Sequence, residues 1–299
     1  MLNLNQFKDS GFFTAKQHSQ TGKEMSNEPR PRGRPLGRPR AFADKTDQNT
    51  VQALDRALDL LEMLAATPGR TLSDLATDAG LPVATVFRAL ATLQAHGMVE
   101  SEDPGQFWHI GPGAFRIGSA FLRRTKVVER ARQPMDHLMR ETGETANLGI
   151  ESGDQVLFLA QVETTHAIRA FFPPGTMAPM HVSGIGKALL AWYPEEKTAG
   201  ILARQGMEPF TSLSLSSESS LRRDLARTRD RGFAIDDQER NDGMRCVAAP
   251  IFNAHGEPVA GLSVSGPAFR MGLSEANKFG ALVQAAADKV TAATGGVRP

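Results

Sequence analysis

The chain has 299 residues, 40% of them hydrophobic, which predicts two domains with conventional cores, whereas its net charge of +1 identifies no class of partner. Its single cysteine excludes an intrachain disulfide framework and favours a reducing compartment. No apolar run approaches the roughly 20 residues of a membrane span, and the N-terminus has no signal-peptide pattern, so we expect a cytoplasmic protein without a membrane partner.

Residues 1–49 show no sustained hydrophobic period and are rich in Gly, Pro, Ser, Asn and Gln, which predicts a disordered basic tail. From Arg30 to Arg40 the tail holds five arginines and no acidic residue. Its PRGRP segment resembles the core of an AT-hook, in which arginines enter the narrow minor groove of A·T-rich DNA. A solvated basic linker that contacts only phosphates is an equal alternative. The tail residues expected to contact DNA are Arg32, Gly33, Arg34, Pro35 and Arg38.

Residues 50–111 are predicted to form a winged helix-turn-helix domain. Their first apolar residues recur at spacings of three and four, which indicates an amphipathic helix. A capping box of Thr71 and Asp74 opens a short second helix, and a tight glycine-containing turn leads to a third helix over about residues 83–96. Two helices joined in this way are typical of the helix-turn-helix, whose second helix lies in the major groove of DNA.

The third predicted helix has a buried stripe and an outward face. Val86, Leu90 and Leu93 form the stripe, and a two-stranded wing is expected to follow over residues 98–110. Residues 50–124 hold six basic and eight acidic side chains, so attraction to phosphate has to come largely from the arginine tail. The outward positions expected to contact DNA are Val83, Ala84, Thr85 and Arg88.

Residues 112–125 are predicted to form a linker helix, and residues 126–299 a second domain. In the second domain, strand-like alternation at 145–150 and 155–162, continued at 168–172, is interleaved with helical segments. This order of elements predicts an α+β domain in which helices pack on a central antiparallel sheet.

The last strands of this predicted sheet carry small polar residues. Two apolar runs between 245 and 265 flank a connection of hairpin length, which predicts an antiparallel pair with Cys246 roughly opposite Ser263. Strand side chains alternate between two faces, so Ser265 shares the face of these residues, and Asp236 ends a neighbouring strand-like run. The pattern predicts a shallow polar concavity whose buried hydroxyls need partners, which a bound ligand can supply.

A family resemblance rests on two segments of the second domain, GFAIDDQERNDGMRCVAAPIFNAHGEPVAGLSVSGP at 232–267 and PMHVSGIGKALLAW at 179–192. Over about residues 50–296 the chain resembles the IclR family of bacterial transcriptional regulators, and within it the acetate-operon-repressor branch. The resemblance implies a GAF-like α/β effector domain and a homodimer or homotetramer that binds a palindromic operator in double-stranded DNA. It also implies an effector site at Gly184, Ile185, Asp236, Met244, Cys246, Ser263 and Ser265.

None of these positions is lysine or arginine, so a carboxylate would be held by the backbone N–H groups of Gly184 and Ile185 and by the Ser263 and Ser265 hydroxyls. Asp236 would accept from a hydroxyl or hydrated carbonyl at the other end of the ligand. Ile185 stands where the branch usually has alanine, so we expect a narrow pocket. The expected effector is a small 2-oxo acid, glyoxylate first and pyruvate second, with an aromatic acid as the alternative.

Other functions are less well supported by the residues. The segment around Lys187 lacks the first glycine and the Ser or Thr of a phosphate-binding loop, and no His/Cys spacing indicates a metal. A hydrolase using Ser263 or Cys246 has no histidine nearby in sequence. An architectural DNA-binding protein led by the arginine tail is a further alternative. The prediction is therefore a ligand-responsive transcriptional regulator with no catalytic residue, no cofactor and no metal.

Overall fold

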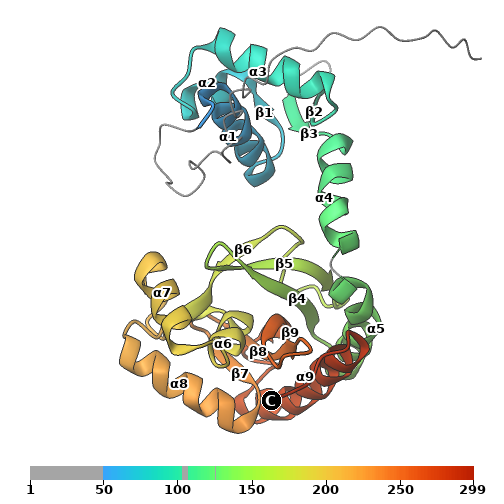
Figure 1. The fold of residues 1–299 in the computed structure, drawn as a ribbon, viewed down its shortest axis with the longest axis vertical. Helices are drawn as coiled ribbons and strands as arrows, with labels where there is room; N and C mark the ends of the chain where they lie inside the picture. Colours follow the sequence, from blue (N-terminus) through green and yellow to red (C-terminus); the bar gives the residue numbers. More distant parts are fainter. Residues whose placement is uncertain (1–49, 103–106, 125) are drawn as a thin grey trace, which may run out of the picture. The chain divides into compact units, whose positions relative to one another are not determined.

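A computed structural model describes residues 50–102, 107–124 and 126–299 (Figure 1). The predicted DNA contacts of the tail therefore lie outside the described residues, as does the tip of the predicted wing. None of the described helices is both long and apolar enough to cross a membrane.

The N-terminal part is a helix-turn-helix with a small sheet. Its helices are α1 (Gln52–Ala66), α2 (Leu72–Asp78) and α3 (Val83–Ala95). The expected cap of α2 is confirmed, because the Thr71 hydroxyl accepts from the Asp74 N–H at 3.2 Å. Leu60, Leu75, Val86 and Leu90 are fully buried in its core.

The wing is completed by a strand that the sequence did not indicate. Strands β2 (Val99–Glu102) and β3 (Phe107–Ile110) pair as expected, and β1 (Arg70–Thr71) adds to β3 on its other edge. Two residues are too few for an alternating pattern, so β1 exists only through its pairing with Phe107 and Trp108.

Helix α4 (Pro112–Arg124) and helix α5 (Lys126–Thr142) follow. Pro134 lies inside α5, which is one continuous helix. One face of α5 is buried in the core of the second domain through Val127, Ala131 and Met135. The free energy gained by this packing offsets the cost of the backbone hydrogen bond that proline removes.

The second domain has the predicted α+β architecture, with one antiparallel sheet of order β6-β5-β4-β9-β8-β7 (Figure 1). Helices α5 and α9 pack on one face, and α6, with α8 beside it, lies on the other. The strands are β4 (Thr145–Ser152), β5 (Gln155–Val162), β6 (Met177–Pro179), β7 (Ala234–Asp237), β8 (Met244–Phe252) and β9 (Pro258–Pro267). The helices are the 3-10 turn η2 (Met180–Val182), α6 (Gly184–Leu190), α7 (Glu195–Gln205), α8 (Glu218–Arg231) and α9 (Leu273–Ala293).

The strand expected at 168–172 is absent, and β6 takes the edge position instead. Side chains satisfy the backbone of this segment: the Thr145 hydroxyl donates to the Ala170 carbonyl at 3.1 Å, and Arg270 donates to the Ile168 carbonyl at 2.8 Å. A segment whose carbonyls are bound by side chains has less need of a neighbouring strand.

The register of the β8–β9 hairpin differs from the expectation. Cys246 lies opposite Ser265, two residues beyond the expected Ser263, and Ser263 lies opposite Ala248; a one-residue shift in the pairing between Ile251 and Phe252 accounts for part of this difference. Such a bulge next to a turn moves every later pair along the strand. The face shared by the two serines and Cys246 is unchanged.

Candidate functional site

A row of polar side chains crosses the α6 face of the large sheet on five adjacent strands. The pairing places Asn147 of β4 beside Gln161 of β5 and Ser263 of β9, and it places Cys246 of β8 between Ser265 and Asp236. The structure thus brings together four of the residues predicted from the sequence and adds two more. This polar row consists of Gln161, Asn147, Ser263, Ser265, Cys246 and Asp236.

Asn147 links the row and was missed by sequence reasoning. It is fully buried, and its Nδ2 lies 3.3 Å from the Ser265 Oγ and 3.5 Å from the Ser263 Oγ. Gln161 donates to the Asn147 Oδ1 at 3.0 Å, and this bond turns the amide N–H groups toward the serines. The available signal was a buried strand, 145–149, whose polar and apolar residues alternate, but its pairing with β9 is not local in sequence.

The start of helix α6 covers the row. Ser183 caps the helix by accepting from the Gly186 N–H at 3.3 Å. A Cβ at Gly184 would lie 2.7 Å from the Cys246 Sγ, so only glycine allows the helix to approach the thiol this closely. Gly184 and Ile185 are the first two helical residues, and their N–H groups therefore have no acceptor within the helix.

Ile185 packs against two glycines of the sheet, Gly149 and Gly261, which lie two residues from Asn147 and Ser263 on the same strands. Its Cγ2 would lie 2.7 Å from a Cβ at Gly261, and its Cδ1 would lie 3.3 Å from a Cβ at Gly149. The side chain thus fills the space that these glycines leave on β4 and β9. The expectation of a narrow pocket stays a prediction.

Gly261→Ala is expected to destabilise the second domain by about 1–3 kcal/mol, because the new methyl group collides with Ile185. Ile185→Ala alone should also destabilise it, by leaving a cavity. Chemical denaturation of both single variants and the double variant checks this contact. The double variant should be more stable than the sum of the single effects predicts, whereas simple additivity would contradict the contact.

The side chains of the row differ in exposure, and Gln161, at its β5 end, is half-buried whereas Asp236, at its β7 end, is buried. Asn147 and Ser263 are fully buried, whereas Cys246 and Met244 keep some exposed surface. Burial and the nearby Asp236 carboxylate raise the pKa of the Cys246 thiol to about 12, against hydrogen bonds with Ser265 and Ser263 that lower it. The thiol therefore stays protonated at neutral pH, which makes it a weak hydrogen-bond donor and a poor nucleophile.

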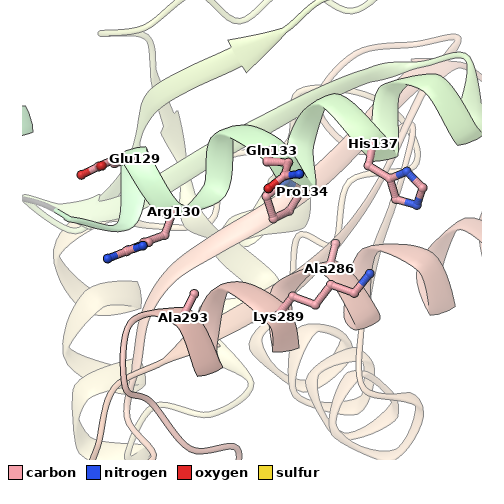
Figure 2. A pocket seen from close by; sticks show the side chains of 8 residues that line it. All are labelled: Glu129, Arg130, Gln133, Pro134, His137, Ala286, Lys289 and Ala293. Atoms are coloured by element: carbon pink, nitrogen blue, oxygen red, sulfur yellow. The ribbon is translucent and has the colours of Figure 1, made fainter.

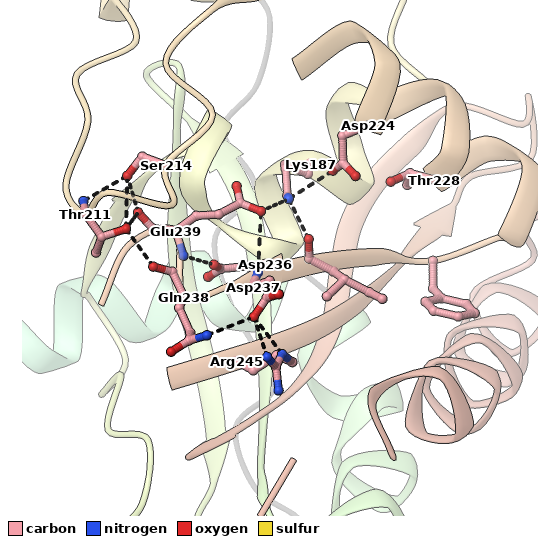
Figure 3. A network of polar contacts seen from close by, with 12 residues as sticks. Lys187, Thr211, Ser214, Asp224, Thr228, Asp236, Asp237, Gln238, Glu239 and Arg245 are labelled. Atoms are coloured by element: carbon pink, nitrogen blue, oxygen red, sulfur yellow. Dashed lines mark hydrogen bonds and ion pairs between the residues drawn. The ribbon is translucent and has the colours of Figure 1, made fainter. Parts of the chain in front are cut away.

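Beside the row, a buried charge cluster surrounds Lys187 of α6 (Figure 3). The Lys187 Nζ lies 2.9 Å from the Asp224 Oδ2, pairs with Glu239 and donates to the Ile235 carbonyl. Lys187 is fully buried, and the two carboxylates hold its pKa above the usual value despite the cost of burial. The ammonium group of Lys187 is occupied by these partners within the protein. This agrees with the sequence analysis, in which the segment around Lys187 does not form a phosphate-binding loop.

Asp236 connects the charge cluster to the polar row. Its Oδ1 accepts from the Glu239 N–H at 2.8 Å (Figure 3). Burial is the main cause that raises the Asp236 pKa to about 7, and the Glu239 carboxylate adds to it while Lys187 opposes it. The Asp236 carboxyl is therefore poised between its protonated and ionised forms near neutral pH.

The stability of the protein should depend on this carboxyl. The folded protein binds the Asp236 proton more tightly than the unfolded chain does, because the pKa of Asp236 is near 7 in the folded state and 3.8 ordinarily. The stabilisation that this proton contributes is complete below about pH 3.8 and is lost as the pH rises through 7. We expect the free energy of unfolding of the wild type to fall relative to Asp236→Asn between about pH 5 and pH 8. Urea denaturation at several pH values measures it. The exposed Asp242→Asn is the control, and parallel curves for wild type and Asp236→Asn would contradict the expectation.

The outward face of α3 places the predicted DNA contacts together. Val83, Ala84 and Arg88 are exposed, and Thr85 is partly buried. Phe87 is 52% exposed and was missed, although an apolar residue outside the buried stripe was a signal. Exposed aromatic and methyl groups on a recognition helix can contact the thymine methyl group in the major groove.

Two open hollows lie elsewhere on the second domain, and neither contains a predicted site residue. One, of about 530 Å³, lies between α5 and α9 (Figure 2), and the other, of about 790 Å³, lies beside α5 and β5. Among the described residues, no group of three or more His, Cys, Asp or Glu could hold a metal ion. The first hollow is lined by Glu129, Arg130, Gln133, Pro134, His137, Ala286, Lys289 and Ala293.

Comparison with known proteins accounts for both parts of the chain. Residues 53–103 match the IclR helix-turn-helix domain, and residues 119–292 match the bacterial transcriptional regulator IclR C-terminal domain. The HTH-type transcriptional regulator BhcR of Paracoccus denitrificans is 51% identical over 83% of this chain and 88% of its own. The transcriptional repressor IclR of Escherichia coli is 41% identical over 88% and 97%. The crystal structure of Thermotoga maritima IclR covers 82% of this chain and 99% of its own, with a TM-score of 0.69 at 26% identity.

Proposed function

Because this chain belongs to the IclR family of bacterial transcriptional regulators, we propose that its effector is a small 2-oxo acid, glyoxylate first and pyruvate second. The protein is a ligand-responsive DNA-binding regulator and not an enzyme, as its relatives are. The regulated genes would then serve the metabolism of that acid.

The observation that carries this proposal is the composition of the polar row. Ser263, Ser265 and Asn147 offer neutral donors on a buried floor of sheet, which suits one carboxylate. Asp236 at the end of the row can accept from the hydroxyl of a hydrated carbonyl. These small side chains, close beneath α6, favour a ligand of few atoms over an aromatic ring.

Within this proposal the ligand has one orientation. Its carboxylate lies toward the serines and the Gly184 and Ile185 N–H groups, and its hydrated carbonyl lies toward Asp236. Met244 and Cys246 cover the apolar side. A protonated Asp236 would also donate to a carbonyl oxygen, so both of its forms can serve the ligand.

For the DNA-binding part, we propose the segment 50–111, joined by a linker helix over 112–125 to an effector domain over 126–299. Helix α3 would enter the major groove with Val83, Ala84, Thr85 and Arg88. The basic tail would add attraction to phosphate, and at A·T-rich flanks of the operator it would also contact the minor groove. The tail residues in this proposal are Arg32, Gly33, Arg34, Pro35 and Arg38.

The assembly we propose is a homodimer that can associate to a homotetramer on a palindromic operator. Leu54 and Leu58 are exposed on α1, with the exposed Val51 directly before that helix, and Phe115 and Ile117 are exposed on α4. Apolar surface of this kind, outside the cores, favours contact between two copies of the N-terminal part. Two copies related by a two-fold axis match two half-sites of a palindrome.

Release of DNA by the effector tests the proposed function. Fluorescence anisotropy of a labelled operator should change on addition of glyoxylate at lower concentration than pyruvate. An aromatic acid such as benzoate serves as the competing ligand. A stronger response to benzoate, or no response to either 2-oxo acid, would overturn the proposed effector.

A further inference from the structure

Arg240 has a buried nitrogen without a partner. The residue lies in the loop between β7 and β8, and its Nη1 is buried with no hydrogen-bond acceptor among the described residues. Its other contacts are weak: Nη2 lies 3.4 Å from the Met177 carbonyl oxygen, and the guanidinium carbon lies 5.8 Å from the centre of the Phe210 ring. A buried charged donor left unsatisfied is costly, so it calls for an explanation.

Three other arginines of this domain are paired with carboxylates. Arg245 donates to Asp237 at 2.9 Å, Arg270 to Glu144 at 2.6 Å, and Arg204 to Asp154 at 2.9 Å. Within the described residues, Arg240 has no carboxylate oxygen within 4.0 Å. Arginine stays charged under all ordinary conditions, so it cannot escape this cost by losing its proton.

The guanidinium lies close enough to Asp236, at the β7 end of the polar row, for the two charges to interact. Its loop follows Asp236, whose charge attracts Arg240 without forming an ion pair with it. Met177, which Arg240 contacts, belongs to β6, the opposite edge strand of the sheet from β7. Arg240 therefore connects the loop after β7 with β6, on the side of the site where Asp236 lies.

We propose that Arg240 pairs with the carboxylate of the effector, so that the site selects anions over uncharged molecules of the same shape. This inference rests on the proposed sensing of a 2-oxo acid. The serine hydroxyls and Asn147 bind the carboxylate from the floor of the site, and the guanidinium binds it from the rim. Arginine presents several N–H donors in a planar fork, and Nη1 becomes satisfied only when the anion arrives. Sequence reasoning missed this cation because Arg240 lies outside the positions that the family resemblance implied.

The test compares pyruvate with pyruvamide, which has the same shape and no charge. Calorimetry should show that the wild type prefers pyruvate. Arg240→Gln should lower the affinity for pyruvate by about 10- to 100-fold and leave the affinity for pyruvamide nearly unchanged. Arg240→Lys, which keeps the charge and loses the fork, should retain part of the preference. Arg222→Gln, an exposed arginine of the same domain paired with Glu195 and Glu218, is the matched control and should bind as the wild type does.

Each outcome separates the inference from the function on which it rests. If the wild type binds pyruvate and Arg240→Gln keeps the full preference over pyruvamide, the role of Arg240 is overturned and the effector proposal stands. Equal loss of both ligands, with a lower melting temperature, would show a structural role and also overturn it. If the wild type binds neither glyoxylate nor pyruvate, the effector proposal fails, and the role of Arg240 fails with it.

Discussion

Replacing Ser263 and Ser265 together by alanine is expected to abolish the response to glyoxylate and pyruvate while DNA binding is retained. Both hydroxyls lie in the polar row within reach of the Asn147 amide. A hydrogen bond to a charged ligand contributes about 1.5–3 kcal/mol, so losing two should weaken binding by more than about 100-fold. Calorimetry measures the effector affinity, and anisotropy measures operator binding.

The control for this double variant is Ser212→Ala with Ser216→Ala, which removes two exposed hydroxyls from the same domain. The control should keep the response. Removing both serines of the row also leaves the Asn147 Nδ2 without its acceptors, which is expected to cost about 1–3 kcal/mol of stability. Thermal denaturation therefore has to show a folded variant at the assay temperature. Unchanged glyoxylate and pyruvate affinity in a folded variant would show that the polar row does not bind the effector.

Lys187→Met is expected to destabilise the second domain by about 3–5 kcal/mol, the usual effect of breaking a buried ion pair from one side. Lys187 is fully buried between Asp224 and Glu239, with Asp236 close by. Without the lysine, these carboxylates face one another without a cation. Urea denaturation should show the loss, and the loss should shrink at acid pH as the carboxylates take up protons.

Two further variants define the cause. Glu239→Gln in the Lys187→Met background removes one unpaired charge and should recover part of the stability. Lys278→Met removes an exposed lysine paired with Glu275 and should change the stability by less than about 1 kcal/mol. A Lys187→Met variant as stable as Lys278→Met would contradict the structural role of the cluster.

The helix-turn-helix was predictable because its determinants are local. The capping pair of Thr71 and Asp74 and the glycine-containing turn before Val83 are read from neighbouring residues. The β8–β9 hairpin was predictable for the same reason, since a short connection joins two apolar runs. Its register was not, because the bulge near Phe252 depends on how the pair packs in the sheet.

The candidate site divides in the same way. Alternation along each strand placed Cys246, Ser263 and Ser265 on one face, since strand side chains have a period of two. Asn147 and Arg240 joined the site through contacts between segments distant in the chain, which no local period reports. The direction of the Ile185 side chain also depended on such a contact, with glycines on β4 and β9.

By itself, the sequence determined the kind of protein: two domains, a DNA-binding helix pair, an antiparallel sheet and the polar residues on one face of its last strands. These properties follow from composition, periodicity and short motifs, which act over a few neighbouring residues. Only the tertiary structure decided how Lys187 is neutralised, which strands complete the polar row and that the Arg240 Nη1 is buried without an acceptor in the part of the chain that the structure describes. The physical reason is that burial and pairing are set by groups that are distant in sequence, and the free energy of a buried charge depends on all of them together.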